Sequence, residues 1–142
     1  MKVKILTVFC ILFLLVLAKG NLYSQESNNH IFEINFLSIP YEDINDFMTF
    51  YETVGKPLDA DNEYILSVKV FRHAFGPLWS VCMITEYKDM EGFVAAEKRG
   101  DEIFMKKYPD KSKRDEIMKK YQVYLKGHSD ALVRDYPNLE KK

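Results

Sequence analysis

The chain has 142 residues, of which 47% are hydrophobic and 14% aromatic, and its formal net charge is −1. This length is typical of one domain, and the apolar content is sufficient to build a core. A chain without a basic excess lacks the electrostatic footprint of a nucleic-acid-binding protein.

The first twenty-five residues have the parts of a secretory signal peptide. Lys2 and Lys4 precede an uncharged apolar run from Ile5 to Ala18, which is shorter than the roughly 20 residues of a membrane span. We expect residues 1–25 to be a leader and residues 26–142 to be the mature domain, in the periplasm or secreted; an uncleaved membrane anchor is the alternative. The chain offers three cleavage sites, after Gly20, Ser24 or Gln25.

Loss of the leader changes the charge and the cysteine content. Three lysines leave with it, so 17 basic and 21 acidic residues remain, with a net charge of −4. We therefore expect neither nucleic acid nor a membrane as a partner of the mature chain. Cys82 is then the only cysteine, which excludes an intramolecular disulfide. In its apolar strand this thiol is expected to be buried, with a raised pKa and no catalytic role.

The first elements of the mature chain are a strand and a helix. Residues 31–39 alternate apolar Phe32, Ile34 and Phe36 with polar residues, a period of two that predicts a strand. Pro40 is expected to open a helix that begins at Tyr41, and an apolar stripe at helical spacing follows. This helix is expected to stop at two residues, Gly55 and Pro57.

Two more strands and a hairpin are predicted next. Residues 64–73 and 79–87 are rich in β-branched and aromatic residues, and Ala74 to Pro77 join them. In the second strand Leu66, Val68 and Val70 share one face. The other face is expected to belong to one mixed surface of the sheet, made of Glu33, Asn35, Ser67, Lys69 and His73 among Ile31, Leu37, Ile65 and Phe71.

The C-terminal third is predicted to be helical. A helix begins near Met90, is interrupted at Gly100, and is followed by a second piece from Asp101 to Tyr108. A sequence like a capping box at Ser112 is expected to open the last helix, which runs to about Arg134. The alternative makes Gln122 to Leu125 a short fourth strand. Residues 137–142 are expected to be a frayed tail.

The predicted order β-α-β-β-α-α is most of a ferredoxin-like βαββαβ unit, an α+β sandwich with helices on one face of an antiparallel sheet. The chain also resembles the dimeric α/β-barrel superfamily, through the stretch from His73 to Trp79, residues 81–87 and the later residues 126–130. It is similar there to small exported bacterial proteins of unknown function, and distantly to antibiotic-biosynthesis monooxygenase-like domains. The resemblance implies a homodimer in which the mixed faces of two sheets enclose a partly polar cavity.

The candidate ligand-binding residues are those expected near that cavity. An imidazole changes charge near neutral pH, so His73 and the helical His128 are proposed to line one pocket; a capped sheet edge and a core histidine are the alternatives. The ionisable Glu33, Lys69 and Glu86 and the aromatic Trp79 complete the set, with a structural Lys69 ion pair or an interface anchor as the alternatives. His30 is expected to be solvated. The histidines lack metal-site spacing, so no metal or cofactor is predicted.

Three functions remain open from the sequence. The first is an exported homodimer that binds a small, partly apolar ligand. The second, implied by the resemblance alone, is a monooxygenase-like enzyme, cofactor-independent or haem-using, with a histidine in the cavity. The third is a structural or interaction module of the cell envelope. A fold does not choose among them.

Overall fold

The computed structural model describes residues 29–74 and 79–139. Its strands are β1 (Ile31–Leu37), β2 (Ile65–Arg72), β3 (Val81–Tyr87) and β4 (Ser129–Arg134), and its two longest helices are α4 (Met90–Lys107) and α5 (Lys111–Tyr124). The expected leader, residues 75–78 of the predicted hairpin connection and residues 140–142 lie outside the described residues. Among the helices of the described part, none is long and apolar enough to cross a membrane.

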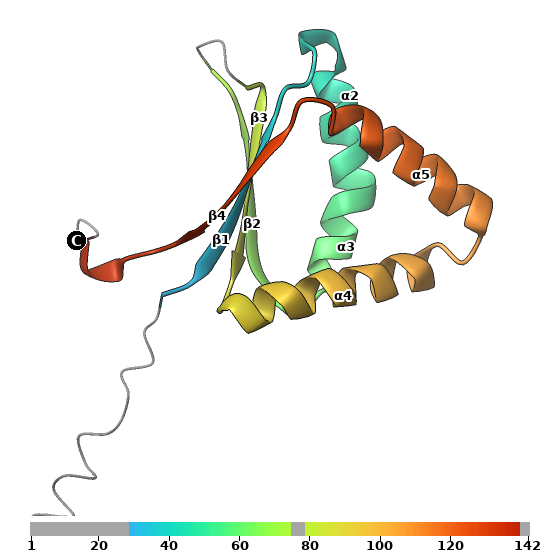
Figure 1. Cartoon of the computed structure of the whole chain (residues 1–142). Coiled ribbons are helices and arrows are strands. Elements are labelled where there is room, and N and C mark those ends of the chain that lie inside the picture. Colours follow the sequence, from blue (N-terminus) through green and yellow to red (C-terminus); the bar gives the residue numbers. More distant parts are fainter. Residues whose placement is uncertain (1–28, 75–78, 140–142) are drawn as a thin grey trace, which may run out of the picture.

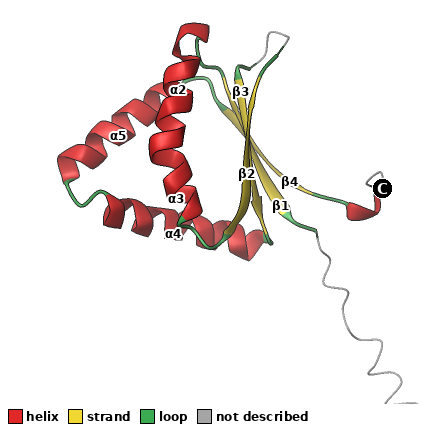
Figure 2. Ribbon diagram, turned by 180° about the vertical axis from the view of Figure 1, so that it is seen from behind, coloured by secondary structure: helices red, strands yellow, loops and turns green. Residues whose placement is uncertain are grey.

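The strands form one antiparallel sheet in the order β2-β3-β1-β4. Helices α2, α3, α4 and α5 lie on one face of this sheet, and no helix of the described residues covers the other face (Figures 1 and 2). The expected α+β, ferredoxin-like sandwich is therefore confirmed. The sheet also contains a fourth strand, β4, in a segment that was predicted to be helical.

The fourth strand corrects the prediction for the C-terminus. Helix α5 ends at Tyr124, and the chain reverses through Gly127, whose φ of 75° lies in the left-handed region. β4 then pairs with the free edge of β1, with Val133 opposite Phe32. Both expectations were wrong: the helix does not reach Arg134, and the strand is not at residues 122–125. A helical stripe and a short edge strand are hard to distinguish in sequence, and the free edge of β1 decides between them.

The helical segment after β1 is longer than expected. A 3-10 turn (Tyr41–Asp43) leads into α2 (Ile44–Phe50), a π-helical turn (Tyr51–Gly55) and α3 (Lys56–Ala60) without a break. Pro57 has no N–H to donate, and it lies in the first turn of α3 directly after the wider π turn. Gly55 and Pro57 therefore widen the helix here and do not end it.

The two long helices also begin and continue differently from the prediction. α4 is one helix that passes through Gly100, and its N-cap Asp89 accepts a hydrogen bond of 2.7 Å from the N–H of Gly92. α5 begins before Ser112, because the Asp110 side chain caps it by accepting from the N–H of Lys113 at 2.7 Å. An N-cap acceptor satisfies an otherwise unpaired amide, which explains both starts. At the far end, Pro137–Leu139 form a 3-10 turn in place of the expected frayed tail.

The main core lies between the sheet, α2 and α5. Phe47, Leu37 and Val81 are its most completely buried side chains, and the rings of Phe47 and Tyr124 meet edge to face with centroids 5.2 Å apart. Burial of one such side chain contributes about 1.5–3 kcal/mol. The main cluster consists of Leu37, Ile39, Ile44, Phe47, Phe50, Val81, Ile117 and Tyr124.

The strand registers decide which side chains face the helices. In β1, Glu33 lies opposite Thr85 and Asn35 opposite Met83, and these four residues all point toward the helices. The predicted mixed surface is therefore wrong, because Glu33 and Asn35 do not share a face with Ser67 and Lys69. Alternation along one strand shows which of its residues share a face. Only the pairing between strands shows which of these faces points toward the helices.

The open face of the sheet, as we call the side without helices, contains three rows of paired residues. Ile34 lies at its centre, between Ile84 on β3 and Ala131 on β4. A β-bulge between Ile65 and Ser67 turns Ile65 to the helix side and leaves Ser67 on the open face. The rows are Ser67, Glu86, Phe32 and Val133; Lys69, Ile84, Ile34 and Ala131; and Phe71, Cys82, Phe36 and Ser129.

We predict that Gly127→Ala lowers the free energy of unfolding by about 1–2 kcal/mol, because an added Cβ is strained at a positive φ. Gly100→Ala is the matched control, since this glycine is helical and its Cβ would meet only the Asn62 amide nitrogen at 3.9 Å. The control is expected to raise stability by about 0.5–1 kcal/mol. Urea unfolding measures both, and an equal response of the two variants would contradict the assignment of this turn.

Candidate functional site

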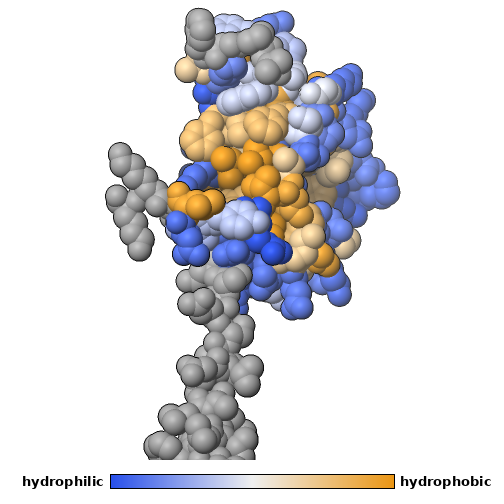
Figure 3. Space-filling view, turned by 60° about the vertical axis from the view of Figure 1, so that its left-hand side comes forward, coloured by the Kyte–Doolittle hydropathy of each residue, from blue (hydrophilic) through white to orange (hydrophobic). Residues whose placement is uncertain are grey.

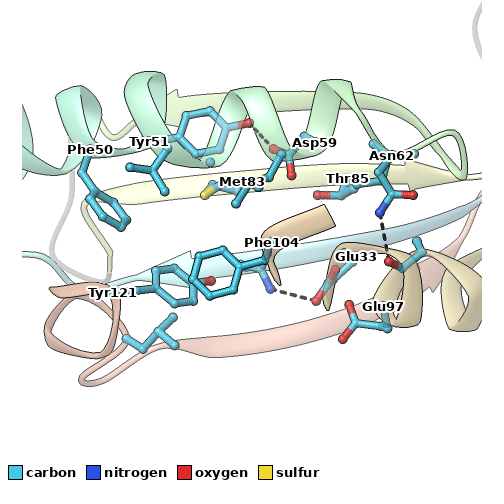
Figure 4. Close-up of a pocket in the computed structure, with 18 of the residues that line it drawn as sticks. Glu33, Phe50, Tyr51, Asp59, Asn62, Met83, Thr85, Glu97, Phe104 and Tyr121 are labelled. Carbon is cyan, nitrogen blue, oxygen red and sulfur yellow. Dashed lines mark hydrogen bonds between the residues drawn. The ribbon is translucent and has the colours of Figure 1, made fainter. Parts of the chain in front are cut away.

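A cavity of about 460 Å³ lies between the sheet and the helices. We call it the helix-side cavity; Figure 4 shows eighteen of its residues. Its apolar wall includes Phe50, Met83 and Phe104, and its polar wall includes Thr85 and Asn62. A concave site with apolar walls and a few converging polar groups is the usual form of a small-molecule pocket, and this volume lies in the usual range of about 300–1,000 Å³.

Glu33 brings a carboxylate from β1 to the floor of this cavity. It accepts hydrogen bonds from the Asn35 side chain at 3.2 Å and from the Tyr87 hydroxyl at 2.9 Å. Burial, followed by the charge of Glu33, raises the pKa of Tyr87. The amide of Asn35 also donates to Asp130 at 3.0 Å, which ties β1 to β4 at the cavity edge. Among the described residues, the donors to this carboxylate are therefore neutral groups.

Tyr51 and Asp59 form the opposite wall. The Tyr51 hydroxyl donates to Asp59 at 2.7 Å, and burial raises the pKa of Asp59 while this hydrogen bond lowers it. The π-helical turn brings the two residues together, and its Gly55 makes room for the ring. A Cβ at Gly55 would lie 2.5 Å from Cδ2 of Tyr51, closer than real Cβ contacts come.

Helix α4 contributes two further carboxylates, those of Glu97 and Asp101. Asn62, which is buried, donates to the carbonyl of Ala96 at 2.9 Å and so fixes this part of the helix against the turn before β2. Desolvation, then the negative charges of Glu33 and Asp101, raises the pKa of Glu97. Because Glu97 keeps contact with solvent in the single chain, this effect is moderate.

The open face is a second candidate surface. Figure 3 shows hydrophobic side chains gathered over the sheet with hydrophilic ones around them. Phe71 and Val133 are 46% and 41% exposed although both are apolar. Apolar residues that adjoin one another on a soluble surface are typical of an interface. Glu86 is the carboxylate of this face, and it accepts from Ser67 and contacts Nδ1 of His30 at 2.6 Å. Both contacts lower the pKa of Glu86, and the hydrogen bond from Ser67 has the larger effect.

An aromatic cluster lies at one end of the open face. The Trp79 ring lies 5.7 Å from Phe36 and stacks on His73 with centroids 4.5 Å apart. Nδ1 of the His73 ring also hydrogen-bonds the carbonyl of Trp79, and the backbone N–H of His73 donates to the carbonyl of Ser80. These contacts agree with the alternative in which His73 caps the sheet edge.

The six candidate ligand-binding residues, which were predicted to lie near one cavity, belong to two different surfaces in the structure. Glu33 and His128 line the helix-side cavity, whereas Lys69, His73, Trp79 and Glu86 belong to the open face. His128 lies in the turn before β4 and not on a helix; it contacts Leu125 and, at 3.2 Å, Asp130. His73 and His128 therefore lie at opposite edges of the sheet and cannot line one pocket.

Three smaller expectations can also be compared with the structure. His30 is not a free solvated group, because it pairs with Glu86. Among the described residues no ion pair joins Lys69 to Glu33 or Glu86, and Glu33 lies on the other side of the sheet. The burial and raised pKa expected for Cys82 are confirmed, since its thiol is 6% exposed and desolvated.

Sequence reasoning missed Tyr51, Asp59, Tyr87 and Glu97 as a group. The positions of Asp59 and Glu97 depend on the π turn and on the unbroken path of α4, neither of which was expected. One signal was available: Tyr51 and Asp59 are eight residues apart, a spacing that returns to the same helix face after about two turns. The expected stop at Gly55 prevented its use.

Comparison with solved structures supports the fold. The chain is similar to an uncharacterized NIPSNAP domain protein from Burkholderia xenovorans (TM-score 0.58, 14% identity, 78% of this chain and 99% of that one). It is also similar to a dimeric ferredoxin-like protein from an uncultured marine organism (0.56, 10%, 82% and 96%). A third is an ethyl tert-butyl ether D (EthD) family protein from Bacillus halodurans (0.52, 17%, 75% and 99%). No family model and no curated protein matches the sequence. At these identities the likeness shows the ferredoxin-like fold alone.

We predict that Glu97→Gln raises the urea midpoint of unfolding at neutral pH. The pKa of Glu97 is higher in the folded state than in the unfolded chain, so its ionised form opposes folding once the pH exceeds the folded pKa. The gain should shrink as the pH falls below about 4, where the carboxyl group becomes protonated in both states.

Glu102→Gln on the same helix is the control for this pH dependence. Glu102 accepts from Arg99 at 3.1 Å on the exposed surface, so its loss is expected to lower stability slightly. A stabilisation by Glu97→Gln that is independent of pH, or a loss of stability at neutral pH, would contradict the electrostatic account of the cavity.

Proposed function

We propose that the mature chain is an exported homodimer that holds a small, partly apolar molecule in the helix-side cavity. The observation that carries this proposal is the cavity itself, with its apolar wall and its converging polar side chains. Such a concavity can bury the apolar part of a small molecule while its polar side chains fix the orientation of the molecule. The proposal moves the ligand from the space between two sheets, where it was expected, to the space under the helices of each subunit.

The open face supports the dimer. Its central row contains Ile84, Ile34 and Ala131 side by side, and an apolar sheet face of this kind is poorly suited to water. A two-fold axis through Ile34 would pair the face with its own copy, as in an isologous interface. The similar ferredoxin-like protein from an uncultured marine organism is described as dimeric.

The two surfaces then give different roles to the six candidate residues. Glu33 and His128 would contact the ligand, because they line the cavity. The other four, Lys69, His73, Trp79 and Glu86, would lie at or near the contact between subunits. Glu86 can be buried there without a partner lysine, since Ser67 and His30 already contact its two oxygens.

Export is supported by the basic start and the apolar run of residues 5–18. Expression of the full chain in a bacterial host with fractionation of the periplasm tests it. We expect the exported form to have an intact mass that corresponds to a start at residue 21, 25 or 26, whereas a full-length membrane-bound product would refute cleavage.

We predict that the wild-type mature protein is a dimer by size-exclusion chromatography with light scattering, and that Ile34→Glu makes it monomeric with unchanged far-UV circular dichroism. The change places a charge at the centre of the open face, where its desolvation opposes association. Val94→Glu is the control, because Val94 is 61% exposed on α4, away from the sheet. A wild-type monomer at high concentration, or equal effects of both variants, would rule out this interface.

We predict that Gly100→Leu weakens binding of a neutral aromatic probe, 2-naphthylmethanol, measured by ligand-observed NMR. Gly100 lines the cavity, and its Cβ would point at Asn62, which lines it too, so the larger side chain occupies the space. Gly100→Ala, which adds one carbon, is the matched control and should keep binding. Equal binding by the wild type and the two variants would place the probe elsewhere.

A further inference from the structure

The charged side chains of the helix-side cavity are almost all of one sign. Its described lining residues include neither lysine nor arginine, and His128 is the only basic group. The acidic groups come from four elements, so they surround the space and do not form a single surface strip. They are Glu33 on β1, Asp59 on α3, Glu97 and Asp101 on α4, and Asp130 on β4.

Of these five carboxylates, only Asp130 contacts a basic group among the described residues, at 3.2 Å from Nε2 of His128. Glu33 and Asp59 receive hydrogen bonds from the neutral groups of Asn35, Tyr87 and Tyr51, and Glu97 has no hydrogen bond or ion pair with any described residue. The mutual repulsion is visible in the raised pKa of Glu97, for which desolvation is the first cause and the charges of Glu33 and Asp101 follow.

Aromatic side chains form much of the remaining wall. Figure 4 shows Phe104 and Tyr121 beside Glu33, with Tyr51 across the cavity. The pKa of Tyr121 is raised by desolvation and then by the charge of Glu33, among other cavity carboxylates, so its ring shares their electrostatic environment. Aromatic faces attract cations through the ring quadrupole and also bury apolar groups. Carboxylates and aromatic rings together are a suitable environment for an ammonium group that carries an apolar body.

We propose, on the basis of the ligand-binding function above, that the helix-side cavity selects a small organic cation: an amine, protonated at neutral pH, on an apolar or aromatic body. The ammonium group lies between Glu33 and Glu97, and the body lies against Phe104, Tyr121 and Met83. A neutral ligand would leave these carboxylates unpaired and an anion would be repelled. A bare metal ion fits less well, because no group of three or more ligating side chains with metal-site geometry occurs among the described residues.

The test compares three probes of one shape on the mature dimer at neutral pH. They are 2-naphthylmethylamine, which is a cation, 2-naphthylmethanol, which is neutral, and 2-naphthoate, which is an anion. Isothermal titration calorimetry or ligand-observed NMR gives the three dissociation constants. We expect the cation to bind about tenfold more tightly than the alcohol, in keeping with one charge-assisted contact, and the naphthoate to bind most weakly.

Glu97→Gln removes one charge without removing a hydrogen bond between described residues. We expect it to weaken cation binding about three- to tenfold, a range that allows for partial solvent screening, and to leave the alcohol unchanged. Glu102→Gln makes the same charge change on the outer side of α4, where the residue pairs with Arg99 and does not line the cavity. This control should leave all three constants unchanged.

The outcomes separate the two proposals. If the alcohol binds as tightly as the amine, or if Glu97→Gln and Glu102→Gln change amine binding equally, the cation preference is overturned while the cavity remains a ligand site. If none of the three probes binds, the ligand-binding function and the cation preference are both overturned. If Gly100→Leu binds the amine as tightly as the wild type does, the cation binds outside the cavity. That outcome would also overturn the inference.

Discussion

The position of β1 in the sheet is the constraint on which the rest of the structure depends. β1 is hydrogen-bonded to β3 on one side and to β4 on the other. These two pairings fix which of its side chains point toward the helices and which point to the open face. One face places Glu33 and Asn35 under the helices, and the other places Ile34 on the open face. A slip of one residue would exchange the two sets and would remove both the polar floor of the cavity and the apolar surface for a partner.

The helices complete the cavity because they are held apart. The segment after β1 continues past Gly55 into α3, and the N-caps Asp89 and Asp110 set where α4 and α5 begin. Figures 1 and 2 show these helical segments on one side of the sheet, and side chains of the helices and of the sheet together line the cavity. The carboxylates that line it repel one another, so this arrangement costs stability that a ligand of opposite charge would restore. This is the physical link between the fold, the raised pKa of Glu97 and the proposed cation.

Much of the fold was predictable from periodicity, and less of the site was. The three strands from 31 to 87, and the starts of the helices between and after them, were placed within a few residues, because alternation and helical stripes are local signals. The continuation of the helix past Pro57 was missed, since a proline in a first helical turn is as favourable as one after a helix end. The strand at residues 129–134 was missed because its short sequence is stabilised by pairing with β1 and has little pattern of its own.

The sequence by itself determined the order of the first three strands and of the helices that follow them. It also contains a basic start and an apolar run, whose proposed removal would leave Cys82 as the only cysteine and an acidic net charge. These depend on composition and near neighbours along the chain. Only the tertiary structure decided that Glu33 faces Glu97, that His73 and His128 lie at opposite sheet edges, and that the cavity is under the helices. Those facts depend on strand register and on the path of α3 and α4, which long-range hydrogen bonds and packing select and no local pattern contains.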